Sequence, residues 1–133
     1  MKSIILALAL ISTVAHATED TEHNPCDAVE NDVQTLACSA YGKAPAEQLL
    51  ADNLQSLFER LQTLYADNKA QLNDITSKIR VAQQLWQKQR DADCAIAAFP
   101  AKPSSEAYKI AENDCMAQVS DDRSEFLEWI GRE

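Results

Sequence analysis

Apolar residues recur along most of the chain at the spacing of an α-helix. Two sets repeat at intervals of four and three residues, which places each set on one helical face. The first predicts a helix from about Pro45 to Ala66, and its members are Leu50, Leu54, Leu57, Leu61 and Leu64, with Phe58 and Tyr65 beside them. The second predicts a helix over about 69–98, and its members are Leu72, Ile75, Ile79, Ala82 and Trp86, with Leu85 beside them.

Two further helices are predicted at the ends of this pair. Asn31 with Gln34 resembles a capping box and starts a short helix, which the Gly-Lys-Ala-Pro stretch at 42–45 interrupts. Its apolar stripe is Val33, Leu36, Ala37 and Ala40. Ser104 or Ser105 caps a last helix that runs to about Ile130. Its predicted inner side holds Ala107, Ile110, Ala111, Cys115, Val119, Phe126, Leu127 and Ile130.

These elements predict an all-α fold in a single domain. The connections at Asp67-Asn68 and at 99–105 are short, so successive long helices should be antiparallel neighbours. Prolines at 100 and 103 end the helix that precedes them, because proline cannot continue a helix interior. We therefore expect a small antiparallel helical bundle of three long helices plus a short N-terminal one.

The first seventeen residues have the pattern of a secretory signal peptide. Lys2 precedes an apolar run over 4–11, and Ala15-His16-Ala17 is an A-x-A cleavage site. A membrane anchor would need roughly 20 apolar residues, about twice this run. The predicted organisation is a signal peptide over 1–17, a polar lead over 18–30 and a helical domain over 31–133. The predicted location is the periplasm, with secretion beyond it as the alternative, and no membrane anchoring after cleavage.

The net charge of the chain limits the classes of partner that it is expected to bind. Removing residues 1–17 leaves 11 basic and 21 acidic residues, a net charge of −10. Nucleic acids and anionic lipids are disfavoured, because their binding proteins present basic surfaces. An acidic surface keeps a protein soluble and also steers a cationic protein partner toward it.

Four cysteines predict two disulfides: Cys26, Cys38, Cys94 and Cys115. A zinc site is disfavoured, because no two cysteines lie closer than twelve positions. Local pairing is preferred, as Cys26–Cys38 and Cys94–Cys115; the alternative joins Cys26 to Cys115 and Cys38 to Cys94. In one straight helix the first two would lie about 18 Å apart, so local pairing requires residues 26–31 to fold back.

The residue inventory does not fit an enzyme. Histidine occurs only at positions 16 and 23, which removes Ser-His and Cys-His catalysis, and no zinc-protease or glycine-rich phosphate motif is present. Carboxylate pairs such as Asp91/Asp93 and Asp121/Asp122 are typical of solvated helix faces. We expect no catalytic residues, no metal and no cofactor.

Residues 82–94 carry the most specific motif, Ala-Gln-Gln-Leu-Trp-Gln-Lys-Gln-Arg-Asp-Ala-Asp-Cys. It resembles the signature of the LprI N-terminal-like family of exported bacterial proteins, A-Q-x-x-W-x-x-x-R-D-A-x-C. Cys26 and Cys38 have that family's offset, and residues 61–65 match its L-N-x-x-Y motif except at Gln62. Downstream, Cys115, Arg123 and Leu127 also fit. The resemblance implies the helical fold and, through the family's namesake, inhibition of lysozyme.

The motif residues have structural interpretations. Trp86 lies on an apolar stripe and reads as a core anchor, with a binding hot spot as the alternative. Arg90, one turn further, should pair with Asp91, Asp93 or an acid of a neighbouring helix, or cap a helix end. Arg123 has the same interpretation.

Two functions remain, both of a binding module. The first is a lysozyme inhibitor, whose candidate contacts are Lys102 and Ser104 in the 99–105 turn and the acidic Asp121 and Asp122. The second is a periplasmic envelope-interaction or stress-protection protein with another, cationic, protein partner. The sequence does not separate the two and gives no oligomeric state.

Overall fold

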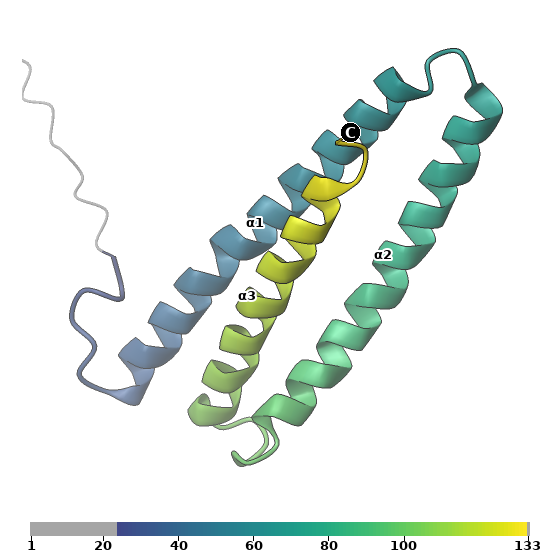
Figure 1. Ribbon diagram of the computed structural model, residues 1–133. Coiled ribbons are helices and arrows are strands. Elements are labelled where there is room, and N and C mark those ends of the chain that lie inside the picture. Colours follow the sequence, from purple (N-terminus) through teal and green to yellow (C-terminus); the bar gives the residue numbers. More distant parts are fainter. Residues whose placement is uncertain (1–23, 133) are drawn as a thin grey trace, which may run out of the picture.

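The computed structural model describes residues 24–132, and regular structure in them consists of three α-helices. Helix α1 spans Asp32–Leu64, α2 spans Lys69–Ala98 and α3 spans Glu106–Trp129. The chain runs up along α1, down along α2 and up along α3, as Figure 1 shows. The predicted all-α, disulfide-clamped antiparallel bundle is confirmed.

The predicted short N-terminal helix is wrong, because α1 continues without a break through Gly42 and Pro45. An interior proline removes one backbone hydrogen bond and crowds the preceding turn, at a cost of about 3 kcal/mol. Packing on both sides of the proline offsets this cost. Ser39 and Ala46 are buried, and a disulfide at Cys38 holds the first turns of the helix.

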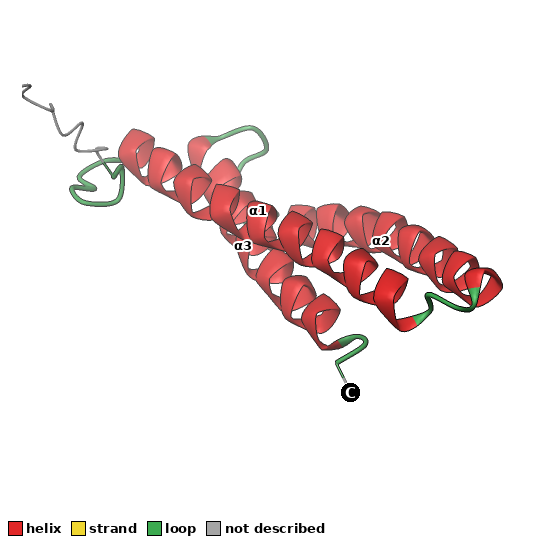
Figure 2. Ribbon diagram, turned by 90° about the horizontal axis from the view of Figure 1, so that it is seen from above, coloured by secondary structure: helices red, strands yellow, loops and turns green. Residues whose placement is uncertain are grey.

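The core is small and centred on α1. Leu50, Leu57 and Leu61 of this helix meet Ile79 of α2 and Leu127 of α3 in one buried cluster. Helix α1 packs chiefly against α3, whereas α2 touches α1 little. Viewed from above, α3 crosses α1 at an angle, and its end marked C points away from α2 (Figure 2).

Small polar residues, rather than large apolar ones, line much of the contact between α1 and α3. Ser120 and Ser124 of α3 are fully buried. Asn53 Nδ2 donates to Ser124 Oγ at 2.7 Å, and Asn113 Nδ2 donates to Ser39 Oγ at 3.2 Å. Short side chains let the two backbones approach closely and exchange side-chain hydrogen bonds.

This packing corrects part of the predicted inner faces. Phe126, placed on the inner side of the last helix, is 54% exposed, because the serines turn a different side of α3 toward α1. Val33 and Leu64, also predicted to face inward, are 64% and 59% exposed at the two ends of α1.

Each helix begins where its capping residue predicts. Asn31 Oδ1 accepts from the Gln34 amide at 3.0 Å, and Asn68 Oδ1 accepts from the Gln71 amide at 3.0 Å. Of the two candidate caps for the last helix, the structure uses Ser105. A side-chain acceptor at this position satisfies an amide that the first helical turn leaves without a partner.

The local disulfide pairing is confirmed. Cys26 and Cys38 are bonded with their Cα atoms 4.8 Å apart, and Cys94 and Cys115 with theirs 5.5 Å apart. The first bond folds residues 26–31 back along α1, as the cap at Asn31 allows. The second fastens the end of α2 to the middle of α3.

None of the three described helices combines the length and the apolar character that a membrane span requires. The predicted signal peptide over 1–17 and residues 18–23 of the predicted lead lie outside the described residues, so both stay predictions.

Candidate functional site

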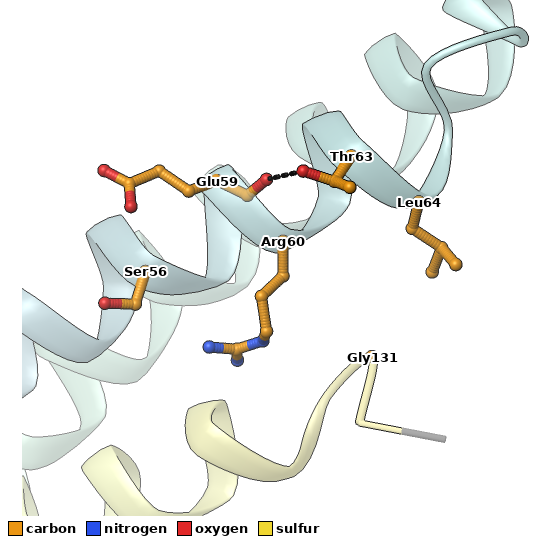
Figure 3. A pocket seen from close by; sticks show the side chains of 6 residues that line it. All are labelled: Ser56, Glu59, Arg60, Thr63, Leu64 and Gly131. Carbon is orange, nitrogen blue, oxygen red and sulfur yellow. Dashed lines mark hydrogen bonds between the residues drawn. The ribbon is translucent and has the colours of Figure 1, made fainter.

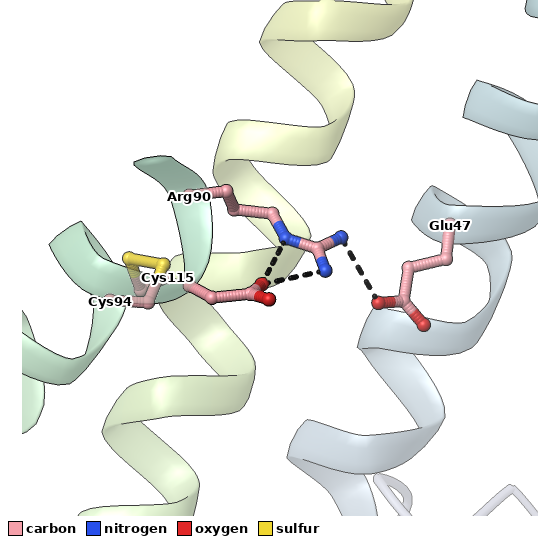
Figure 4. Close-up of polar contacts among 5 residues, drawn as sticks. Glu47, Arg90, Cys94 and Cys115 are labelled. Atoms are coloured by element: carbon pink, nitrogen blue, oxygen red, sulfur yellow. Dashed lines mark hydrogen bonds and ion pairs between the residues drawn. A yellow bond between two sulfur atoms is a disulfide. The ribbon is translucent and has the colours of Figure 1, made fainter. Parts of the chain in front are cut away.

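The motif residues of α2 lie where that helix meets its neighbours. The half-buried Trp86 packs against the core cluster, at the position of the predicted anchor. Asp91 Oδ1 accepts from Arg90 Nε at 3.0 Å and from Arg90 Nη2 at 2.8 Å. Arg90 Nη1 reaches Glu47 of α1 at 3.4 Å (Figure 4). Arg90 therefore ties α2 to α1 beside the Cys94–Cys115 bond.

Arg123 of α3 faces the same tryptophan from the other helix. Its guanidinium carbon lies 5.7 Å from the Trp86 ring centroid and 4.9 Å from that of Phe126, within the range of cation–π attraction. Its Nε donates to Oε1 of the buried Gln83 at 3.1 Å. Desolvation by burial lowers the pKa of Arg123 below its usual value. Neither the ion pair nor the helix cap predicted for Arg123 is seen within residues 24–132, where its side chain contacts an amide and two aromatic rings.

Arg60 of α1 has a capping role that the sequence did not suggest. Its Nη2 donates to the carbonyl oxygens of Leu127 at 2.9 Å, Glu128 at 3.3 Å and Ile130 at 3.2 Å. The last carbonyl groups of a helix lack intrahelical donors, and a cation there also complements the helix dipole. Only knowledge of how α1 packs on α3 reveals this partnership.

A hollow of about 500 Å³ lies beside Arg60, between the last turns of α1 and the C-terminal turn. Figure 3 shows its lining, which consists of Ser56, Glu59, Arg60, Thr63, Leu64 and Gly131. Thr63 Oγ1 donates to the Glu59 carbonyl at 3.2 Å, and Arg60 is engaged by α3. The lining therefore offers no activated nucleophile or paired acid and base.

The described part of the chain also provides no evident metal site. Residues 24–132 contain no histidine and no group of three His, Cys, Asp or Glu side chains placed to hold an ion. All four cysteines are consumed in disulfides.

The 99–105 turn forms an exposed tip where α2 passes to α3. Lys102 and Ser104 are both exposed, and Ser104 has a positive φ of 65°. Backbone hydrogen bonds close the turn, from the Ala101 amide to Ala98 and from the Ser105 amide to Lys102, each 3.0 Å. Pinned by these bonds and by the nearby disulfide, the tip presents a fixed shape.

Asp121 and Asp122 lie on the exposed side of α3, well away from that tip. Sixteen residues of helix separate Ser105 from Asp121, which corresponds to about 24 Å. Asp121 borders a shallow hollow between α1 and α3, lined by Leu49, Asn53, Asp121, Ser124, Glu125 and Glu128. The structure therefore does not bring the two pairs of predicted contacts together; they form two separate candidate surfaces.

The fold and the surface define a small, disulfide-clamped helical module without an evident catalytic centre in residues 24–132. Residues 26–127 match the family described as lysozyme inhibitor LprI, and the chain belongs to this family. A crystal structure of a DUF1311 family protein from Pseudomonas putida KT2440 is similar to it, with 39% sequence identity and a TM-score of 0.70. The similarity covers 80% of this chain and 99% of that one. No curated protein matches the chain.

Proposed function

We propose that this protein is an exported binding module that inhibits lysozyme by docking on it. The observation that carries the proposal is the match of residues 26–127 to the family of the lysozyme inhibitor LprI. An inhibitor needs a stable surface rather than reacting groups, and the described residues offer surface of that kind. Two disulfides suit an oxidising compartment such as the periplasm, where a cell wall would be protected.

The acidic face of α3 is the first candidate contact with the enzyme. This helix carries seven acidic and two basic side chains, whereas α2 carries three acidic and five basic. Asp121, Asp122 and Glu125 are exposed there. Lysozymes are typically cationic, so this face would steer the encounter and pair with basic residues at the rim of the cleft.

The 99–105 tip is the second candidate contact. Lys102 and Ser104 project from a turn that is stiffened by two prolines and fastened by a disulfide. A rigid loop loses little conformational entropy on entering a cleft, so more of its contact energy appears as affinity. The two candidates predict different effects of mutation.

The test is a lysozyme activity assay with the oxidised protein lacking residues 1–17, at low and moderate salt. We expect dose-dependent inhibition that weakens as salt rises, because salt screens electrostatic steering. Asp121→Lys with Glu125→Lys should weaken inhibition at least tenfold. The control, Asp27→Lys with Asp67→Lys, makes the same change in net charge at exposed sites outside α3.

The outcomes separate the candidates. Equal loss in both double variants would assign the effect to overall charge and exclude a local contact at α3. Loss in Lys102→Glu with Ser104→Gly would assign the contact to the tip. No inhibition of chicken-type or goose-type lysozyme at micromolar excess would overturn the proposal and favour the alternative, an envelope protein with another cationic partner.

A further inference from the structure

Helix α2 carries an exposed apolar stripe on the side opposite its core contacts. Val81, Leu85, Ile96 and Phe99 are 53%, 62%, 71% and 82% exposed. At about 100° per residue these four side chains fall within an arc of about 60°. The buried Ile79 lies on the opposite side of the helix. A surface helix with one buried face normally presents polar residues there, so a second apolar stripe indicates a second contact.

The charge distribution favours this helix as the place where two copies meet. The chain is strongly acidic overall, which makes copies repel one another. Helix α2 is the exception, with five basic and three acidic side chains, whereas α3 has two basic and seven acidic. Copies that approach through α2 keep their most acidic helices apart, and the two α2 helices, each with a net charge of +2, repel one another less than two α3 helices at −5 would.

The stripes of two copies can also pack against each other with their side chains in register. If two α2 helices run antiparallel and cross near Arg90, Val81 of one lies opposite Phe99 of the other, and Leu85 lies opposite Ile96. Near the centre Lys88 meets the small Ala92 of the second copy, which leaves room for its aliphatic stem. An antiparallel pair of this kind has twofold symmetry, in which each contact occurs twice.

A charge pair fits at the same centre. Both nitrogens of Arg90 that contact Asp91 use its Oδ1, and within residues 24–132 Oδ2 accepts no side-chain hydrogen bond. Lys88 lies at the edge of the stripe and Asp91 lies further round the helix on the same side, so twofold pairing places the long side chain of Lys88 of the second copy on the side of this oxygen. In this arrangement apolar side chains of one copy pack against apolar side chains of the other, and a lysine of each copy lies near a carboxylate of the other.

We propose that two copies of this chain associate through antiparallel packing of their α2 helices along this stripe. The stripe runs from Val81 to Phe99, which is eighteen steps along the helix or about 27 Å. Two such helices bury an area at the small end of specific interfaces, about 1,200 Å² in total. An interface of this size is expected to give a reversible dimer, whose affinity depends on the quality of the contacts rather than on their area. This proposal is independent of lysozyme inhibition.

The first test is sedimentation velocity on the oxidised protein lacking residues 1–17, from micromolar to millimolar concentration. We expect a monomer–dimer equilibrium that Leu85→Glu with Ile96→Glu abolishes. The control, Val33→Glu with Leu64→Glu, introduces the same charges at sites of similar exposure on α1 and should dimerise like the wild type. A wild type that stays monomeric, or a dimer insensitive to the α2 variant, overturns the proposal.

The second test addresses the orientation of the helices. Leu85→Cys and Ile96→Cys are prepared separately, mixed, and cross-linked with a short bifunctional maleimide. Antiparallel packing predicts efficient cross-linking between the two different variants and little within either alone. Efficient cross-linking of Leu85→Cys with itself would require a parallel pair and overturn the arrangement.

Discussion

The pair formed by α1 and α3 is held together differently from α2. Between α1 and α3 the contact is continuous, with the buried Leu57 and Leu127 at its centre and Ser124 accepting a hydrogen bond across it. Helix α2 contributes Ile79 to the core and is further joined by separate links: the Cys94–Cys115 bond, the Arg90–Glu47 ion pair and the stacking of Trp86 against Arg123. The family motif therefore contains these links, and its tryptophan also packs against the core.

Removing the Cys94–Cys115 disulfide, which fastens α2 to α3, should have the largest effect on stability. Cys94→Ala with Cys115→Ala releases a loop of about 21 residues, and we expect a loss of about 3 kcal/mol in the free energy of unfolding. Urea denaturation measures this loss. Hydrogen exchange should show lost protection concentrated in α2, with the centre of α1 still protected.

The other disulfide provides the matched comparison. Cys26→Ala with Cys38→Ala should release residues 26–38 and lower protection in the part of α3 that borders this bond, at Ile110, Asp114 and Ala117, while leaving exchange in α2 unchanged. Equal loss of protection in all three helices after removal of the 94–115 bond would show that α2 is not a separate unit.

Removing the polar link between α2 and α3 should have an intermediate effect. Arg123→Met keeps a long apolar stem but leaves Oε1 of the buried Gln83 without its donor. Leaving a buried acceptor unsatisfied costs about 1–2 kcal/mol. Arg80→Met is the control, since Arg80 is exposed and only stacks on Phe58 at 4.7 Å, so about 0.5 kcal/mol is expected.

A thermal or urea unfolding curve distinguishes the two variants. Adding Gln83→Leu to Arg123→Met should recover part of the loss, because neither polar group then remains buried without a partner. If Arg123→Met destabilises no more than Arg80→Met, Arg123 is not a link between these helices.

The features that could be predicted from the sequence are those set by residues close to one another along the chain. The bounds of α2, the cap at Asn31 and the local disulfide pairing all follow from spacing along the chain. Arg90 was predicted to pair with a carboxylate, but Glu47 could not be named as its partner on α1, and the contact of Gln83 with Arg123 was missed. No periodic signal marks a residue whose partner lies 40 or more positions away.

The errors in α1 and α3 have the same origin. Local rules stop a helix at Gly42 and Pro45, but burial of Ala46 on the far side of the proline holds α1 together. Hydrophobicity alone placed Phe126 inside, whereas Ser120 and Ser124 occupy that contact. Close packing of two helices selects small side chains, and serine is indistinguishable from a surface residue in a hydrophobic pattern.

The smallest predicted effect concerns Gly42, where the sequence predicts a break and the structure has a continuous helix. Gly42 lies inside the helix, and a Cβ added there would meet no atom within 4 Å. Gly42→Ala should therefore stabilise the protein by about 0.5–1 kcal/mol, since alanine favours the helix and loses less backbone entropy on folding.

Gly131→Ala is the opposite control: that glycine has a φ of +74°, where a Cβ is strained, so destabilisation of about 1 kcal/mol is expected. The prediction is tested by whether Gly42→Ala raises or lowers the urea midpoint of unfolding. A lower midpoint would mean that α1 bends or opens at Gly42 in solution, and that the well-packed pair of helices contains its own weak point beside Pro45.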